Sequence, residues 1–162
     1  MTCQFSRSSP NLIATGCYNG VVAIYDIRVP EDKPIADSKL LPGKHLDVVW
    51  ETQWVPRNTS GGADKGETLV SISSDGRVVE WSMKKGLEYQ DLMNMKRQGN
   101  PANKEDNIEG INFRNTAGFS FDFLKNEGSV YLASTEDGTV HRCSKSYNEQ
   151  YLENYFGHKG KD

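Results

Sequence analysis

The stretch ETLVSISSDGRVVEWS, residues 67–82, predicts a β-hairpin and decides the fold of the chain. It consists of a strand at 68–73, a turn at Asp75-Gly76 and a strand at 78–81. An Asp-Gly pair between two β-branched runs is a strong hairpin signal, because glycine adopts a positive φ without a Cβ penalty. Trp81 follows Gly76 by five residues, and the same spacing occurs twice more in the chain.

The repeat aligns three segments on their turn glycines: ATGCYNGVVAIYD, VSISSDGRVVEWS and ASTEDGTVHRCS. Tyr25, Trp81 and Cys143 lie five residues beyond Gly20, Gly76 and Gly138 respectively. Consecutive glycines are 56 residues (20 to 76) and 62 residues (76 to 138) apart, more than the roughly 40–45 residues typical of blade repeats. Polar insertions at 56–66 and 98–109 account for the difference, so we expect one short β-meander per repeat.

The rest of the chain also favours strands, and the fold class is predicted to be all-β. Short β-rich runs separated by turn residues lie at 2–5, 12–17, 21–28, 47–55, 118–124, 130–135 and 139–144. In the run at 47–55, strict alternation predicts that Trp50 and Trp54 share one face. Residues 29–39 contain two prolines and are expected to form an exposed connection. Residues 83–97 fit either helical or strand spacing, and a strand followed by a turn suits the neighbouring pattern better.

Composition limits the classes of partner. The chain has 162 residues, a formal net charge of −3 and a sequence pI near 5.6, which gives no electrostatic reason to expect nucleic acid. It contains no apolar run of about 18 residues, so no membrane span is predicted, and MTCQFSRSSP lacks the apolar stretch of a signal peptide. The three cysteines are widely spaced, which favours reduced thiols over a disulfide framework or a metal site.

Candidate catalytic and metal-binding residues are few. His141 precedes Cys143 by two residues, but a Cys-His dyad needs a stabilised thiolate and an orienting third group, and neither is predicted. Asp75, Glu136 and Asp137 stand in turns, where turn formation explains a carboxylate better than metal binding. The expectation is therefore a non-enzyme with no catalytic residue, cofactor or metal.

The repeat resembles the WD-repeat propeller family, in which a Gly-His pair precedes a four-stranded blade and an aromatic-Asp pair closes its third strand. The resemblance implies a buried structural tetrad of His45, Ser71, Asp75 and Trp81. In it the aspartate orients the histidine, the histidine bonds the hydroxyl, and the hydroxyl bonds the indole N–H. Such a chain satisfies polar groups that would be costly to bury alone.

The other two repeats depart from this pattern. Asn19 replaces the turn aspartate of the first repeat, and Cys143 replaces the tryptophan of the third. Ser82 also stands where the family has an aspartate after Trp81. The tetrads of the first and third repeats are therefore expected to be incomplete.

Three longer stretches narrow the resemblance: KHLDVVWETQW, LVSISSDGRVVEWSMKKGLEYQDLMNMKR and CSKSYNEQYLENYFGHKG. They are similar to the WD-repeat region of axonemal dynein intermediate chains, especially the type found on the two-headed inner-arm dynein. The resemblance implies about three consecutive blades of an incomplete ring, and hence a fragment or truncated product. The expected division is 1–42 for a partial blade one, 43–97 for blade two, 98–117 for a polar loop, and 118–162 for blade three and the start of the next.

By this resemblance the chain is expected to be a non-catalytic scaffold in a dynein complex. The implied partners are a dynein heavy chain and other dynein intermediate and light chains, with no nucleic acid and no membrane. The implied location is the cytoplasm and cytoskeleton, in the axoneme of a cilium or flagellum. Candidate partner contacts are Tyr147, Tyr151, Tyr155, Lys84 and Lys85, although inter-blade packing also explains the tyrosines and a solvated face explains the lysines.

The alternative from another functional class is a general peptide-recognition propeller, such as the substrate receptor of a ubiquitin ligase. In either case three blades cannot close a ring, so the first and last sheets would expose faces that neighbours normally cover. We therefore expect the isolated chain to aggregate or to depend on partners.

Overall fold

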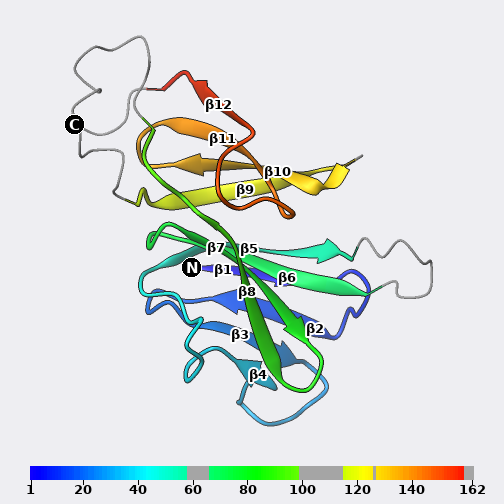
Figure 1. Ribbon diagram of the computed structural model, residues 1–162. Coiled ribbons are helices and arrows are strands. Elements are labelled where there is room, and N and C mark those ends of the chain that lie inside the picture. The colour runs from blue at the N-terminus through cyan, green and yellow to red at the C-terminus, as the bar shows by residue number, and fades with distance from the viewer. Residues whose placement is uncertain (58–65, 99–114, 126, 159–162) are drawn as a thin grey trace.

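The structure is a computed structural model that describes residues 1–57, 66–98, 115–125 and 127–158. Within these residues the chain forms only β-strands and no helix (Figure 1). The strands are β1 Thr2–Phe5, β2 Leu12–Gly16, β3 Val22–Asp26, β4 Ala36–Asp37, β5 Val49–Pro56, β6 Glu67–Ser73, β7 Arg77–Met83, β8 Leu87–Asn94, β9 Gly118–Leu124, β10 Glu127–Thr135, β11 Thr139–Ser144 and β12 Glu153–Phe156.

The strands form three four-stranded antiparallel sheets, and in each the strand order follows the order of the chain. Sheet one is β1–β4, sheet two is β5–β8 and sheet three is β9–β12. Figure 1 shows sheet three, coloured yellow to red, at one end of the stack. The all-β prediction is confirmed, and the three sheets are consistent with about three blades of an incomplete propeller.

The repeated turns have the backbone that the sequence predicts. Gly20, Gly76 and Gly138 have φ values of 80°, 79° and 77°, a conformation that residues with a Cβ rarely adopt. Each turn joins the second and third strands of its sheet. The turn glycines therefore give a common frame for comparing positions in the three sheets.

Two apolar clusters hold neighbouring sheets together. The cluster between sheets one and two contains Ala14, Val22, Ile24, Val49, Leu69, Val79 and Trp81. The cluster between sheets two and three contains Val55, Val70, Ile72, Val78, Leu92, Met93, Met95, Phe121, Tyr131, Ala133 and Cys143. The first strands of the sheets, β1, β5 and β9, also lie side by side in that order. Each sheet thus stacks on the next in the same sense.

The prediction that both tryptophans of β5 share one face is wrong. The register of β5 against β6 shifts between Val49 and Glu51, and such a bulge reverses the side-chain alternation beyond it. Trp50 packs edge to face on Phe119 of sheet three, with ring centroids 5.8 Å apart. Trp54 donates its indole N–H to the Gln4 carbonyl of sheet one at 3.0 Å. The two indoles therefore serve opposite interfaces.

Residues 29–39 are not only a connection, because they include the two-residue strand β4. Ala36 and Asp37 pair with Ile24 and Ala23 of β3, and the Ser38 hydroxyl accepts the Val22 N–H at 2.9 Å. The strand expected within 83–97 is confirmed as β8. Most of the predicted loop at 98–117 and of the insertion at 56–66 lies outside the described residues.

Candidate functional site

The four residues of the implied tetrad lie in one hydrogen-bonded chain at the interface of sheets one and two. His45 Nδ1 is 3.2 and 3.1 Å from the two Asp75 carboxylate oxygens, and His45 Nε2 is 2.7 Å from Ser71 Oγ. The Trp81 indole N–H donates to Ser71 Oγ at 2.8 Å. With the proton on Nδ1, the imidazole donates to Asp75 and accepts from the Ser71 hydroxyl, so every donor has an acceptor.

Burial and charge both suit a structural role for the hydrogen-bonded tetrad. His45 and Ser71 have no exposed surface, and Trp81 is 1% exposed. Burial alone would raise the pKa of Asp75, but the hydrogen bond from His45 and the N–H groups of Leu46 and Arg77 outweigh it and lower this pKa below its usual value. The carboxylate thus stays ionised while it holds His45. A substrate has no access to these polar groups.

The equivalent positions of sheets one and three do not repeat the tetrad. In sheet one, Tyr25 and Thr15 take the places of Trp81 and Ser71, and the Thr15 hydroxyl donates to the Ala23 carbonyl instead. In sheet three, Cys143 and Ala133 occupy the positions equivalent to Trp81 and Ser71. Both are buried and apolar in character.

Sheet three instead contains a polar network that the sequence did not predict, centred on His141. His141 is fully buried, with Nδ1 2.7 Å from Asn154 Oδ1 and Nε2 3.2 Å from Thr135 Oγ1. The Tyr151 ring stacks on the imidazole at a centroid distance of 3.9 Å. The Thr135 hydroxyl also bonds the Asp137 carboxylate. The only sequence signal for this network was His141 itself, a histidine at an inward-facing position of a strand.

The same geometry shows why His141 and Cys143 do not form an activated pair. Burial raises the pKa of Cys143 to about 12, and its thiol contacts the His141 carbonyl oxygen at 3.9 Å, not the imidazole. Since the thiolate is the nucleophile, a thiol with this pKa remains protonated at neutral pH.

The buried imidazole of His141 predicts a pH dependence of stability. Burial lowers the pKa of His141 below its ordinary value of 6.5, although the Asn154 hydrogen bond and Asp137 oppose this shift. The unfolded chain therefore binds a proton more readily, so stability is full above pH ~6.5 and falls as the pH drops below it. The loss has a limiting slope of about 1.4 kcal/mol per pH unit.

Urea unfolding at pH 7.5 and at pH 5.5 checks this prediction in the wild type and in His141→Gln. The difference between the two proteins isolates His141 from the other titrating groups. We expect the variant to lose less stability between these pH values than the wild type. Equal losses in both proteins would contradict the assignment.

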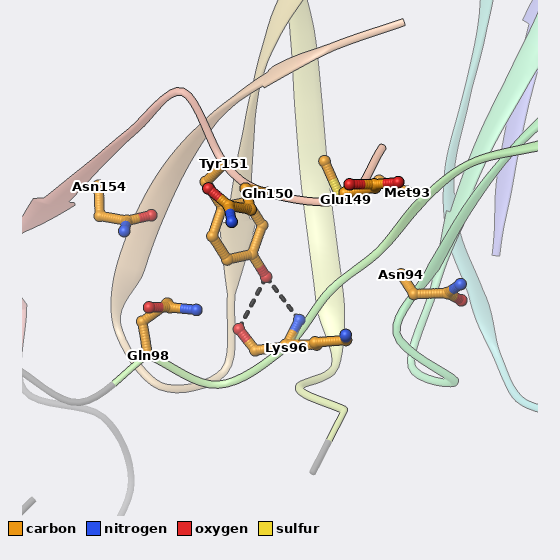
Figure 2. A pocket seen from close by; sticks show the side chains of 8 residues that line it. All are labelled: Met93, Asn94, Lys96, Gln98, Glu149, Gln150, Tyr151 and Asn154. Carbon is orange, nitrogen blue, oxygen red and sulfur yellow. Dashed lines mark hydrogen bonds between the residues drawn. The ribbon is translucent and has the colours of Figure 1, made fainter. Parts of the chain in front are cut away.

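Tyr151 joins sheet three to the end of β8. Its hydroxyl accepts the Lys96 N–H at 2.5 Å and donates to the Lys96 carbonyl at 2.7 Å (Figure 2). A pocket of about 360 Å³ lies beside this contact, lined by Met93, Asn94, Lys96, Gln98, Glu149, Gln150, Tyr151 and Asn154. Polar side chains dominate its walls in Figure 2. Tyr151 thus lies in inter-sheet packing.

The other candidate contact residues lie at the surface. Tyr147 and Tyr155 are 43% and 44% exposed, and Lys84 and Lys85 are exposed in the turn between β7 and β8. His158, which follows β12, is exposed as well. Its position follows β12, where no described sheet packs against it.

Two further features are absent from the described residues. No group of three or more His, Cys, Asp or Glu residues among them is placed to hold a metal ion. No helix of the described part has the length and apolar character to cross a membrane.

Comparison with known proteins identifies similar chains. No protein-family model matches the chain. Dynein axonemal intermediate chain 4 of Xenopus laevis is 47% identical to it over 164 residues, which is 97% of this chain and 22% of that protein. The chain is homologous to the axonemal dynein intermediate chains.

Other dynein intermediate chains show the same relationship. The human dynein axonemal intermediate chain 4 is 46% identical over 97% of this chain and 19% of its own length. The 78 kDa intermediate chain of the flagellar outer arm of Chlamydomonas reinhardtii is 40% identical over 98% of this chain and 23% of its own length. The chain spans about a fifth of the length of these relatives.

Proposed function

We propose that the chain acts as a non-catalytic scaffold within a dynein complex. Its three sheets supply part of the propeller through which an intermediate chain binds a dynein heavy chain. Through this contact it supports axonemal dynein assembly and the movement of the cilium. Other dynein intermediate and light chains are its further partners, and nucleic acid and membranes are not.

The observation that carries the proposal is the 46–47% identity to mammalian and frog intermediate chain 4 over 97% of the chain. The site supports it further, because the tetrad is buried and serves to join strands, as a rigid scaffold requires. The names of the relatives include axonemal chains and a flagellar outer-arm chain. We accordingly propose the axoneme of a cilium or flagellum, within the cytoplasm and cytoskeleton, as the location.

Co-sedimentation tests the proposal. The tagged chain is expressed in ciliated cells, axonemes are extracted with salt, and the extract is separated on a sucrose gradient. The chain is expected to sediment with a dynein heavy chain and to localise to cilia. A chain that stays in the cytoplasm or nucleus and never sediments with a heavy chain contradicts the proposal. Capture of a degron peptide there would instead favour a ubiquitin-ligase receptor.

A charge reversal at the turn between β7 and β8 tests the proposed contact surface. Lys84→Glu combined with Lys85→Glu is expected to weaken co-sedimentation about tenfold, equivalent to about 1.4 kcal/mol, because the exposed ammonium groups would face an acidic partner surface. Lys39→Glu, at an exposed site near β4, is the matched control and should have no effect. Unchanged binding of the double variant would remove these lysines from the interface.

A further inference from the structure

The turn of sheet one contains Asn19-Gly20, the only Asn-Gly pair in the chain. An asparagine before a glycine can lose its side-chain amide, because the glycine nitrogen attacks the asparagine Cγ and no glycine side chain shields that nitrogen. Asn19 is exposed, so water and hydroxide reach its side chain. The pair therefore has the residue types and the access that this reaction needs.

The turn also places the electrophile beside the nucleophile. Asn19 Oδ1 accepts the Val21 N–H at 3.2 Å, so the side chain curls back over the peptide bond that joins Asn19 to Gly20, as in an Asx turn. When the Gly20 nitrogen attacks Cγ, negative charge develops on Oδ1. The Val21 N–H already points at this oxygen and stabilises that charge, as a donor of an oxyanion hole does.

Lys44 stabilises the nucleophile. Its ammonium group donates to the Asn19 carbonyl oxygen at 2.9 Å, and this carbonyl belongs to the same peptide group as the Gly20 nitrogen. When that nitrogen loses its proton, the negative charge is shared with the carbonyl oxygen, where the ammonium group lies. The Gly20 N–H bonds the Cys17 carbonyl at 3.2 Å, a long hydrogen bond that opposes deprotonation only weakly.

The turns of sheets two and three share this geometry but have no amide to lose. Asp75 Oδ1 accepts the Arg77 N–H at 2.9 Å, and Asp137 Oδ1 accepts the Thr139 N–H at 3.3 Å. An ionised carboxylate already carries negative charge and resists attack by an anion. Of the three equivalent turn positions, residue 19 is therefore the reactive one.

We propose that Asn19 is a site of spontaneous deamidation, promoted by the Lys44 ammonium group and by the Val21 N–H. Hydroxide removes the Gly20 amide proton, the nitrogen bonds to Asn19 Cγ, and the bond from Cγ to the side-chain nitrogen breaks. Ammonia leaves with a proton from water. Water then opens the resulting succinimide ring at either of its two carbonyl carbons, which gives aspartate or isoaspartate at position 19.

The two products affect the interface of sheets one and two differently. Aspartate keeps the length of the turn and gives sheet one the Asp-Gly pair that the other two turns already have. Isoaspartate adds a methylene group to the main chain beside Gly20. A Cβ on Gly20 would lie 2.1 Å from the His45 carbonyl oxygen, so a longer turn pushes against the His45 segment and disturbs the tetrad. The proposal goes beyond the scaffold role and does not depend on it.

Peptide mass mapping of the complete chain tests the proposal. During incubation of the folded chain at pH 7.5 and at pH 8.5, the amide of Asn19 is expected to become an acid, about tenfold faster at the higher pH because hydroxide is the base. Asn94 and Asn148 are exposed but precede Met95 and Glu149, so they are internal controls and should stay intact. A folded chain that keeps Asn19 intact overturns the proposal.

Lys44→Met tests the contribution of the ammonium group. Its removal should slow the reaction about tenfold, a smaller loss than at a buried oxyanion hole because Lys44 is partly exposed. Lys44→Arg keeps the positive charge and should react at nearly the wild-type rate, as should the surface control Lys39→Met. A Lys44→Met chain that reacts as fast as the wild type overturns the assigned role of Lys44. If circular dichroism shows that this variant is unfolded, Lys44→Gln replaces it.

Asn19→Asp separates the effects of the two products, because it reproduces the aspartate product alone. We expect this variant to keep the near-ultraviolet circular dichroism of the wild type. Incubated wild type, whose isoaspartate content is measured with an isoaspartate-specific methyltransferase, should lose part of the Trp81 signal. Incubated Asn19→Gln should keep both its mass and its spectrum, because its longer side chain does not readily close the ring. An unchanged spectrum in a chain rich in isoaspartate at position 19 overturns the link to the tetrad.

Discussion

Replacing Trp81 with alanine is expected to destabilise the chain by roughly 3–5 kcal/mol, the range for deleting a large aromatic side chain from a core. Trp81 is 1% exposed and lies in the cluster between sheets one and two. The substitution removes this packing and also the donor to Ser71. The free energy of unfolding in urea measures the effect, at one fixed protein concentration because association shifts apparent stability.

Trp81→Phe separates packing from hydrogen bonding. The phenyl ring keeps most of the apolar volume but has no N–H, so we expect a smaller loss of about 1–3 kcal/mol from the altered hydrogen bonding of buried Ser71 and the change of ring shape. If Trp81→Ala weakened heavy-chain binding while the unfolding free energy stayed at the wild-type value, Trp81 would be a contact residue and its structural role would be wrong.

The sequence predicts most of sheet two because its determinants are local. The turn at Asp75-Gly76 and the alternation of 68–73 and 78–81 fix a hairpin within sixteen residues. The tetrad needs one further residue, His45, and it is the family resemblance that brings this residue to Ser71, since 26 residues separate them. The spacing of residues along the sequence does not by itself predict such a long-range contact.

The features that the sequence did not predict depend on residues outside the local pattern. The bulge at Val49 and Glu51 adds a residue to β5 without altering its alternating appearance, so it placed Trp50 on the unexpected side. The His141 network uses Asn154, which pairs with it only once β12 lies beside β11. β4 has only two residues, too few to show a period.

Replacing Gly20 with alanine is the other substitution with a large expected effect, roughly 2–5 kcal/mol from backbone strain and overpacking together. Gly20 has a φ of 80°, and a Cβ there would lie 2.1 Å from the His45 carbonyl oxygen and 2.8 Å from its carbonyl carbon. These are backbone atoms, which cannot rotate away as a side chain can. The His45 segment or the turn must therefore shift.

Gly86→Ala is the matched control, because Gly86 also has a positive φ, of 125°, but a Cβ there meets nothing within 4 Å. It should cost only about 1–3 kcal/mol, for the backbone conformation alone. The two variants should also differ in whether the His45 segment shifts. A shift of His45 disturbs its bond to Ser71 and hence the surroundings of Trp81, so near-ultraviolet circular dichroism of the folded protein should change in Gly20→Ala but not in Gly86→Ala. Equal unfolding free energies and equal spectra would mean that the sheet one turn does not bear on the tetrad of sheet two.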